Sequence, residues 1–325
     1  MREVVEAIRG AQRITAICHE NPDGDTVGAA VAIAIAAERL GKQAEVVSAD
    51  VPPPFLAVIP RIETIKRAPS LEPDVAVVVD AGDLSRTGRV ATEHAEWLAA
   101  ARIVNIDHHV SNPGFGGVNW VDPEAAATCE MVALLLPELG VEIDEELATV
   151  LMTGIVQDTH TFAHPNATPR TLRVAADLVA AGAPLSRLNR AVYADKPYST
   201  MALWGQLLGG MQQRCDERIV YSSMTLAVLA AVGAEPSASE GFIDLLTQTR
   251  AGDVAVLFKE ADAHTTRVSV RTSDRADAVA ITSVFGGGGH VRAAGCTLAE
   301  PIERARELVL AECERELARA DAGGR

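Results

Sequence analysis

The sequence is poor in aromatic and in basic residues. Aromatic side chains make up 4% of the 325 residues, while alanine and valine dominate, which favours helices and buried sheets packed with small side chains over a β-sandwich. The 29 basic residues are outnumbered by 44 acidic ones, so the formal net charge is −15. This balance argues against long DNA or RNA as a partner, because such binding depends on a basic surface. Small phosphorylated partners stay open, since a few local cations can hold them.

The sequence also lacks paired cysteines and long apolar runs. Its five cysteines are widely spaced, odd in number and without a C-x-x-C pair, which indicates free thiols in a reducing compartment. No apolar stretch is long enough for a membrane span, and the first residues do not have the pattern of a signal peptide. We therefore expect a cytoplasmic protein that does not associate with membranes.

The length and the order of apolar segments predict two domains of an α/β protein. The first half alternates short apolar runs with helical segments, as in a parallel sheet flanked by helices. Later segments at 219–225, 254–260 and 267–272 alternate apolar and polar residues, which is typical of half-exposed strands. We expect a parallel-sheet domain at 1–194, a linker at 195–205 and a smaller mixed-sheet α/β domain at 206–325.

Residues with metal-ligating side chains follow four apolar segments of the first domain. They are His19, Asp23 and Asp25 after residues 14–18, Asp80 after 75–79, the triplet Asp107-His108-His109 after 102–106, and Asp158 after 151–156. The first three segments are predicted strands, and ligands bind at the carboxyl ends of the strands in open α/β sheets. The fourth can be read as a strand or as a helix that starts near Asp144, and we favour the helix.

Carboxylates and imidazoles without thiolates suit Mn²⁺ or Mg²⁺, with Zn²⁺ and Fe²⁺ as further options. Taken singly, Asp80 or Asp158 is explained as well by a cap or a turn. Together, four aspartates in one cleft repel one another unless cations lie among them, and two divalent ions would balance them. Such two-metal sites are typical of displacement at phosphorus. The predicted metal ligands are His19, Asp23, Asp25, Asp80, His108 and Asp158.

The second domain contains four successive glycines, 286–289, directly before His290. Glycines let backbone amides approach a phosphate closely, so we expect Gly287, Gly288, Gly289 and His290 to bind substrate. Arg271 is a further candidate, because its guanidinium can bind phosphate through two hydrogen bonds. A flexible turn and a surface arginine are the alternative interpretations.

Together these motifs resemble the DHH phosphoesterase superfamily. The resemblance is to the DHH–DHHA1 subgroup, which includes NrnA-type oligoribonucleases and phosphatases of 3′-phosphoadenosine 5′-phosphate (pAp). The matching segments span nearly the whole chain. They are His19-Glu-Asn-Pro-Asp-Gly-Asp25, Val-Val-Val-Asp80, Asp107-His108-His109, Gly154-Ile-Val-Gln-Asp158 and Gly-Gly-Gly-Gly-His290.

The resemblance implies specific roles for these residues. One Mn²⁺ would be bound by His19, Asp23 and Asp80, and a second by Asp25, Asp80, His108 and Asp158. Two residues would be catalytic: Asp107 would orient the histidines and His109 would contact the scissile phosphate. The site would lie in a cleft between the domains, and Mg²⁺ or other divalent ions could replace Mn²⁺.

The implied activity is hydrolysis of short oligoribonucleotides to mononucleotides and of pAp to AMP by a water activated between two ions. Cyclic or linear dinucleotides are further candidate substrates, and a homodimer is the implied assembly. Two alternatives stay open. One is an inorganic pyrophosphatase of family II, against which the glycine segment speaks. The other is a nucleotide-binding regulator without turnover, against which the complete ligand set speaks.

Overall fold

The structure is a computed structural model that describes residues 1–72 and 74–323, apart from the side chain of His290. It divides into two compact units, Met1–Asp195 and Lys196–Arg325. This division lies one residue from the expected end of the first domain. Residues 198–205, expected as linker, instead belong to helix α9, whose Leu203 and Leu207 are buried in a core of the second unit.

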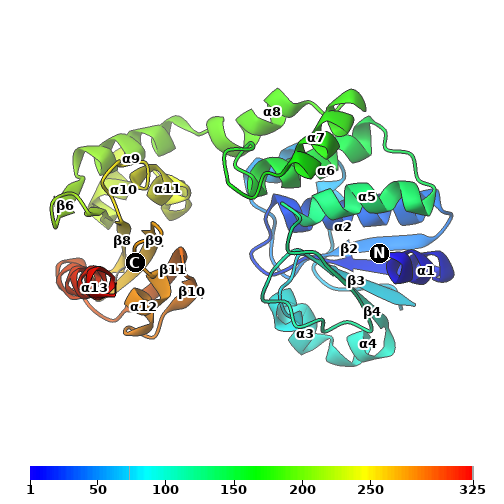
Figure 1. Ribbon diagram of the computed structural model, residues 1–325, viewed down its shortest axis with the longest axis horizontal. Helices are drawn as coiled ribbons and strands as arrows, with labels where there is room; N and C mark the ends of the chain where they lie inside the picture. Colours follow the sequence, from blue (N-terminus) through cyan, green and yellow to red (C-terminus); the bar gives the residue numbers. More distant parts are fainter. Residues whose placement is uncertain (73, 324–325) are drawn as a thin grey trace. The chain divides into compact units, whose positions relative to one another are not determined.

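The first unit is a parallel sheet covered by helices on both faces (Figure 1). The strands, in spatial order, are β2 (Gln43–Val47), β1 (Arg13–Ile17), β3 (Val75–Val79), β4 (Arg102–Asp107) and β5 (Val118–Val121), and every pairing is parallel. The helices are α1 (Arg2–Gly10), α2 (Gly24–Arg39), α3 (Arg89–Glu93), α4 (Ala95–Ala100), α5 (Thr128–Leu139), α6 (Glu145–Asp158), α7 (Pro169–Ala180) and α8 (Leu185–Asn189), with a π-helix at Arg190–Ala194. Short 3-10 helices lie at Pro54–Val58, Ile62–Thr64 and Leu84–Thr87.

The strand order places a crossover between β1 and β3. From β1 the chain continues to β2, which lies on one side of β1, and then crosses to β3, which lies on the other side. The loops that follow β1 and β3 therefore run in opposite directions from the carboxyl ends of these strands. In open α/β sheets this topological switch point is where ligands bind. The loop after β1 contains His19 and Asp23, and Asp80 directly follows β3.

Helices α2, α5 and α6 pack together on one face of this sheet, and α3 and α4 cover the other (Figure 1). The first group packs closely because glycines stand at the contact points. A Cβ atom on Gly28 would lie 2.8 Å from both Cys129 Sγ and the Val150 carbonyl oxygen. A Cβ atom on Gly154 would lie 2.6 Å from Asp25 Oδ1. The small residues therefore allow α6 to approach the first turn of α2.

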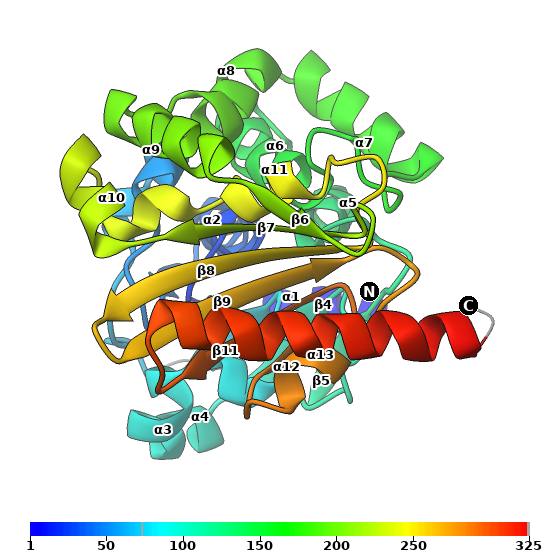
Figure 2. The same ribbon diagram turned by 90° about the vertical axis from the view of Figure 1, so that its left-hand side faces the viewer.

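The second unit is a mixed sheet with helices on both faces (Figure 2). Its strands, in spatial order, are β10 (Gly288–His290), β11 (Ala293–Leu298), β9 (Thr265–Thr272), β8 (Val254–Asp262), β7 (Ile219–Met224) and β6 (Gln212–Arg214). Only the β7–β8 pairing is parallel. The helices are α9 (Tyr198–Gly209), α10 (Leu226–Val232), α11 (Phe242–Leu246), α12 (Ala278–Ser283) and α13 (Ile302–Ala322), with a 3-10 helix at Pro236–Ser239. Helices α12 and α13 pack on one face, and α9, α10 and α11 pack on the other.

These elements confirm the predicted α/β class and the parallel and mixed sheets. The helical reading of the fourth ligand segment is also correct, because Asp158 is the last residue of α6. Part of the glycine segment before and including His290 forms the edge strand β10. The edge strands β5, β6 and β10 were not expected, because three or four residues are too few to show a periodic pattern.

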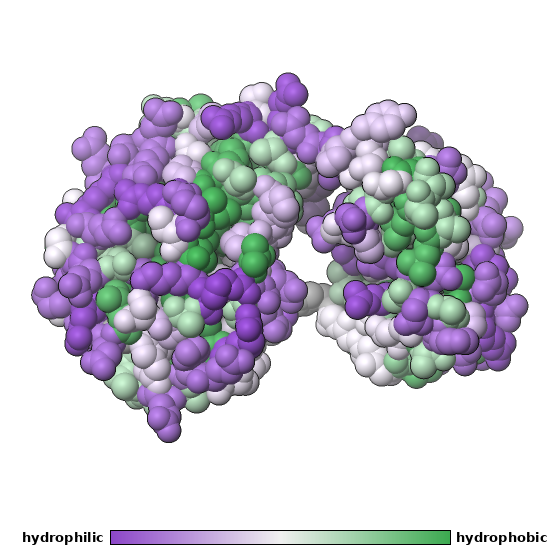
Figure 3. Space-filling model, turned by 180° about the vertical axis from the view of Figure 1, so that it is seen from behind, coloured by the Kyte–Doolittle hydropathy of each residue, from purple (hydrophilic) through white to green (hydrophobic). Residues whose placement is uncertain are grey.

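The described surfaces are largely polar. On the faces visible in Figure 3, hydrophilic residues cover most of both units and hydrophobic residues form smaller patches. Within residues 1–72 and 74–323, the structure contains no helix with the length and apolarity needed to cross a membrane. All five cysteines are free thiols, and only that of Cys215 is exposed.

The close approach of α6 to α2 leads to a stability prediction. Gly154→Ala would place a Cβ atom 2.5 Å from Cys129 Sγ and 2.6 Å from Asp25 Oδ1, so we expect it to lower the free energy of unfolding by about 1–3 kcal/mol. Gly205→Ala is the matched control, because Gly205 is in helix α9 with no other atom within 4 Å of the new methyl group. It should be neutral or raise the free energy of unfolding by up to about 1 kcal/mol. Urea unfolding of both variants measures the difference, and equal values would contradict the packing argument.

Candidate active site

His19 and Asp23 form the first part of the site, after strand β1. His19 Nδ1 lies 2.7 Å from the Glu20 carbonyl oxygen, which directs Nε2 to the opposite side. There, Nε2 is 3.6 Å from Asp23 Oδ2 and 3.6 Å from Asp80 Oδ2. The three side chains form one compact group of potential metal ligands.

The two oxygens of Asp23 have different functions. Oδ1 accepts hydrogen bonds from the backbone amides of Asp25 and Thr26 and so caps helix α2, while Oδ2 faces His19. Asp23, and not Asp25, is therefore the N-cap of this helix. The cap also explains why residues 19–25 are so well positioned, since it fixes the loop to the first turn of the helix.

Asp80 lies in the middle of the site, directly after β3. Its side chain is 3% exposed, and its φ of 57° is in the left-handed region, which costs about 1–3 kcal/mol for a residue other than glycine. Oδ2 faces His19, whereas Oδ1 lies 3.3 Å from His108 Nε2 and accepts a hydrogen bond from Thr128 Oγ1. Asp80 is therefore shared between two groups of side chains.

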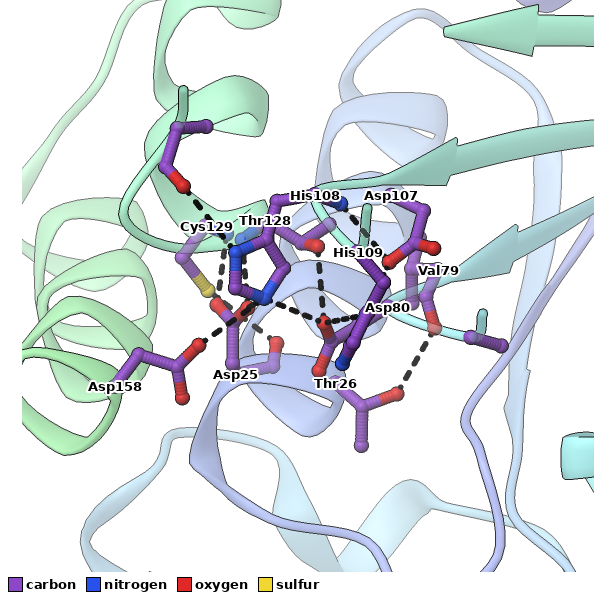
Figure 4. A network of polar contacts seen from close by, with 12 residues as sticks. Asp25, Thr26, Val79, Asp80, Asp107, His108, His109, Thr128, Cys129 and Asp158 are labelled. Atoms are coloured by element: carbon purple, nitrogen blue, oxygen red, sulfur yellow. Dashed lines mark hydrogen bonds and ion pairs between the residues drawn. The ribbon is translucent and has the colours of Figure 1, made fainter. Parts of the chain in front are cut away.

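His108 connects the second group (Figure 4). Its Nδ1 lies 3.2 Å from the Ala125 carbonyl oxygen, and its Nε2 is 3.3 Å from Asp158 Oδ2 and 4.0 Å from Asp25 Oδ2. Asp25, His108 and Asp158 form a second compact set of potential ligands. These residues come from α2, the end of β4 and the end of α6, so the fold brings together positions separated by more than a hundred residues.

The N-terminus of helix α5 holds the carboxylate of Asp25. The backbone amides of Thr128 and Cys129 donate to Asp25 Oδ2 and Oδ1 at 2.6 and 2.8 Å. The positive end of the helix dipole also favours a carboxylate here. This contact fixes Asp25, which is fully buried, in the orientation that faces His108.

The donor set fits divalent cations. The Nε2 atoms of His19 and His108 face carboxylate oxygens at distances of 3.3–4.0 Å, and all of these distances exceed the roughly 2.7–3.2 Å of a hydrogen bond. Two ligand atoms of one tetrahedral or octahedral ion lie roughly 3.0–3.4 Å apart. The Nδ1 atoms of His19 and His108 both face carbonyl oxygens, which can only accept a hydrogen bond, so each Nδ1 carries a proton. In the neutral imidazole, Nε2 then has a free lone pair. Since a lone pair and a carboxylate repel, a cation or a second proton has to lie between them.

The buried carboxylates have strongly perturbed pKa values in the metal-free protein. Burial and the neighbouring Asp80 raise the pKa of Asp25 to about 7. Burial and Asp25 raise the pKa of Asp158 well above its usual value. Burial also acts to raise the pKa of Asp80, but contacts with His108 and His19 outweigh it and hold that pKa below its usual range. Asp80 is thus the carboxylate that stays ionised.

Both histidines take up protons readily when no metal is bound. Burial lowers the pKa of His19, but the carboxylates of Asp23 and Asp80 outweigh it and raise this pKa to about 10. The pKa of His108 is also raised to about 10, because Asp80 and Asp25 outweigh its burial. Protons therefore take the place of cations in the metal-free site.

His109 contacts Asp107 most closely, and its Nδ1 also lies 3.7 Å from Asp80 Oδ1, so Asp80, His108 and His109 form a third compact group of potential ligands. His109 Nδ1 lies 2.7 Å from Asp107 Oδ1, and this contact, opposed by burial, raises the pKa of His109. Asp107 is fully buried and also accepts from the amide of His108 and, through Oδ2, from Asn112 Nδ2 at 2.6 Å. Both oxygens of Asp107 therefore accept hydrogen bonds, and Oδ1 holds the ring of His109 in place.

The glycine segment of the second unit is more ordered than a flexible turn. The amides of Gly286 and Gly287 donate to the carbonyl oxygens of Ser283 and Thr282, so they terminate helix α12 and are not available to a phosphate. Gly289 has a φ of 146° and lies against the backbone of β11, where a Cβ atom would be 2.5 Å from the Ala293 carbonyl oxygen. The expected amide cradle is therefore restricted to the residues after Gly287.

Arg271 and the glycine segment meet in the register of the second sheet. Ala293 pairs with Arg271 on one side and with His290 on the other. Arg271 Nε donates to Asp244 Oδ1 at 3.1 Å, so its guanidinium is partly engaged by a half-exposed acid. The backbone of His290 is in β10, whereas its side chain lies outside the described part of the structure.

Comparison with known proteins agrees with this geometry. Residues 13–155 match the DHH family, N-terminal domain, and residues 219–318 match the DHHA1 domain. A protein of Thermus thermophilus named bifunctional oligoribonuclease and PAP phosphatase NrnA is 36% identical over 319 residues, which cover 98% of this chain and 94% of that protein. The chain belongs to the DHH–DHHA1 phosphoesterase family.

Solved structures show that both units have the fold of this family. An exopolyphosphatase-related protein from Bacteroides fragilis superposes with a TM-score of 0.90 at 22% identity, over 98% of this chain and 97% of that chain. RecJ from Thermus thermophilus, solved in complex with Mn²⁺, superposes with a TM-score of 0.54 at 16% identity, over 98% of this chain and 54% of that one. At these identities the likeness is one of fold.

Four residues that support this site in the first unit were not predicted from the sequence. Thr128 and Asn112 hold Asp80 and Asp107, and Gln157 Oε1 accepts from the amide of Gly24 at the start of α2. Asn166 Nδ2 lies within hydrogen-bonding distance of the carbonyl oxygens of Ala126 and Asp158 and so ties α6 to the segment before α5. None of them is a typical metal ligand, so their residue types contain no signal of a site.

The pKa shifts predict how the stability of the metal-free protein depends on pH. Asp25, Asp158, His19 and His108 have raised pKa values in the folded state, so folding is favoured at low pH and this contribution is lost as the pH rises through about 7 and then about 10. The lowered pKa of Asp80 has the opposite effect, because it favours folding at higher pH, but this contribution changes only in acid. We expect the free energy of unfolding in chelator to fall by roughly 2–4 kcal/mol between about pH 6 and about pH 9.

Urea unfolding at several pH values measures this effect. Saturating Mn²⁺ is the matched condition, because a bound cation displaces the protons and should weaken or reverse the trend. A free energy of unfolding that rises with pH in chelator would contradict the raised pKa values of these four residues.

A second prediction concerns Asp107. Asp107→Asn keeps the size of the side chain but removes the charge beside His109. We therefore expect kcat for phosphoester hydrolysis to fall about 10- to 100-fold, while the affinity for Mn²⁺ changes less than threefold. Mn²⁺ titration followed by electron paramagnetic resonance gives the affinity, and the initial rate gives kcat. A loss of Mn²⁺ affinity as large as the loss of kcat would place Asp107 among the metal ligands.

Proposed function

We propose that the chain hydrolyses short oligoribonucleotides to mononucleotides and removes the 3′-phosphate of pAp, with two divalent cations as cofactors. The observation that carries this proposal is the arrangement of two ligand groups around one carboxylate, Asp80, at the switch point of the sheet. The name of the Thermus thermophilus relative, which aligns over nearly its whole length, supports the choice of substrates. Cyclic or linear dinucleotides are further substrates that the same chemistry would accept.

We assign the cations as the family resemblance implies, and the geometry supports this assignment. His19, Asp23 and Asp80 would hold one ion. Asp25, His108 and Asp158 would hold the other together with Asp80, whose Oδ1 lies 3.3 Å from His108 Nε2. When bound, two divalent ions activate a water and stabilise the charge that develops on the phosphoryl oxygens. Hard oxygen donors with two imidazoles suit Mn²⁺ best and admit Mg²⁺.

His109 would supply a proton donor to the substrate. The contact with Asp107 keeps a proton on Nδ1 and favours the imidazolium, so Nε2–H is free to donate to a phosphoryl oxygen. Such a donor stabilises negative charge most strongly in the transition state. Asp107, anchored in turn by Asn112, would prevent the ring from turning away.

The second unit would hold the remaining part of the substrate. We assign phosphate binding to Arg271 and to the segment Gly288–Gly289–His290, with Gly287 as the residue that fixes this segment against α12. Substrate phosphate would compete with Asp244 for the Arg271 guanidinium, and it has two advantages: a higher charge and a geometry suited to bidentate binding. The homodimer implied by the resemblance stays a prediction that light scattering of the purified protein tests.

The first experiment compares substrates side by side. We expect Mn²⁺-dependent turnover of a short RNA and of pAp, with pyrophosphate hydrolysed at least 100-fold more slowly, and no turnover in chelator. Chromatography of nucleotide products and a phosphate assay measure these rates. Fast pyrophosphate hydrolysis would support the pyrophosphatase alternative, and nucleotide binding without any turnover would support a regulator.

A variant of the shared carboxylate tests the role of the cations. Asp80→Asn should keep the fold, because asparagine tolerates the left-handed conformation found at this position, but it should lower kcat at least about 1,000-fold by removing the charge between the two ions. Asp74→Asn is the matched control at the other end of β3, where Asp74 accepts from the amides of Gln12 and Arg13 far from the ligand groups. It should keep near-normal kcat. An active Asp80→Asn variant would refute the shared-ligand assignment.

A further inference from the structure

One face of the second sheet is covered by helices over only part of its width. Helices α10 and α11 pack on the β7 and β8 side, where Ala255 and Leu257 are buried in a core cluster with them. Farther along the same face, toward β9 and β11, the side chains are half-buried or exposed, and they include Arg267 and Ser269. The opposite face, packed against α12 and α13, is mainly apolar and includes Val256, Phe258, Val268 and Val270.

Three cations stand on this open part of the sheet. Lys259 of β8 pairs directly with Arg267 of β9. Arg271 is four residues farther along β9, on the same face of the sheet. The floor between them is formed by small residues: Ser269 on β9 and its neighbour Gly295 on β11. The surface is therefore basic and low enough for a ligand to lie flat across the strands.

The Lys259–Arg267 pair is unfavourable for the free protein. Like charges on directly opposed positions of a sheet repel, since their Cβ atoms are about 4.5–5.5 Å apart. Burial lowers the pKa of Lys259, Arg267 and Arg271 lower it further, and only Glu240 acts in the opposite sense. Within the described residues neither Lys259 nor Arg267 forms an ion pair, although acidic residues outnumber basic ones by 44 to 29 in this chain. An anionic ligand would relieve this repulsion.

We propose that Lys259 and Arg267 form a second phosphate subsite for the backbone of a single-stranded oligonucleotide. This inference rests on the proposed function and extends it to substrate length. Arg267 and Arg271 are four residues apart on one strand, roughly 13 Å. That is several times the rise of about 3.4 Å per nucleotide in a stacked strand, so the pair meets a phosphate other than the one assigned to Arg271. pAp carries both of its phosphates on one nucleotide, whereas an oligonucleotide can span this distance with its backbone.

The subsite distinguishes oligonucleotides from mononucleotides. An oligonucleotide gains the charge-assisted contacts of Lys259 and Arg267 in addition to those of Arg271, whereas pAp gains only the latter. Lys259 and Arg267 therefore raise kcat/KM for oligonucleotides relative to kcat/KM for mononucleotides. They also contribute to the salt dependence of oligonucleotide binding.

The test uses the full-length double variant Lys259→Gln/Arg267→Gln. We expect the ratio of kcat/KM for a pentaribonucleotide to that for pAp to fall about tenfold, through KM, and the slope of log KM against log salt to decrease by roughly one. Arg304→Gln is the matched control, because Arg304 is an exposed residue of α13, the helix on the opposite face of the sheet. An unchanged ratio, or an equal fall in the control, would overturn the subsite.

Direct binding separates this inference from the proposed activity. Fluorescence anisotropy of a labelled pentaribonucleotide in chelator measures binding without turnover, and the double variant should bind about tenfold more weakly than the wild type. If the wild type cleaves neither substrate but binding shows this difference, the proposed function fails and the subsite stands. Equal affinities of the wild type and the double variant would overturn the subsite whatever the activity.

Discussion

The mutual repulsion of three closely spaced carboxylates is the constraint on which the first unit depends. Asp25 and Asp80 are buried, the side chain of Asp158 is 19% exposed, and all three carboxylates face His108, so without compensation they would favour protonation or unfolding. The protein compensates in two ways. The N-terminus of α5 binds Asp25 through two backbone amides, and the imidazoles of His19 and His108 face the remaining oxygens. The charge that is still missing is that of divalent cations.

Helix packing and site chemistry are therefore linked in this unit. Asp25 can lie against the first turn of α5 only if α2, α5 and α6 approach closely, and this approach requires the absence of side chains at Gly28 and Gly154. The same packing brings Asp158, at the end of α6, to His108. A methyl group added at Gly154 would thus displace Asp25 or α6, so the geometry of the site depends on this glycine as well as on the aspartates.

The sequence predicted the parts of the site that depend on local pattern. Strand ends with ligand-type residues were visible because all-apolar runs precede Asp80 and His108, and the parallel sheet then places these ends along one edge. The supporting contacts were not visible. Thr128 and Asn112 act through single hydrogen bonds to residues that lie 48 and 5 positions away, and their residue types are common everywhere. The roles of the glycines at 286–289 were also hidden, because capping and phosphate binding favour the same residue.

The charge distribution gives a physical reason for a preference for short oligonucleotides under the proposed function. A long nucleic acid would place most of its phosphates against a surface on which acidic residues are in excess, and each such phosphate would add repulsion. A short one needs to meet only the divalent ions, Arg271 and the pair of Lys259 and Arg267. Affinity would then increase over the first few nucleotides and stop increasing beyond them. The acidic balance that argues against long nucleic acid as a partner thus limits the length of the substrate.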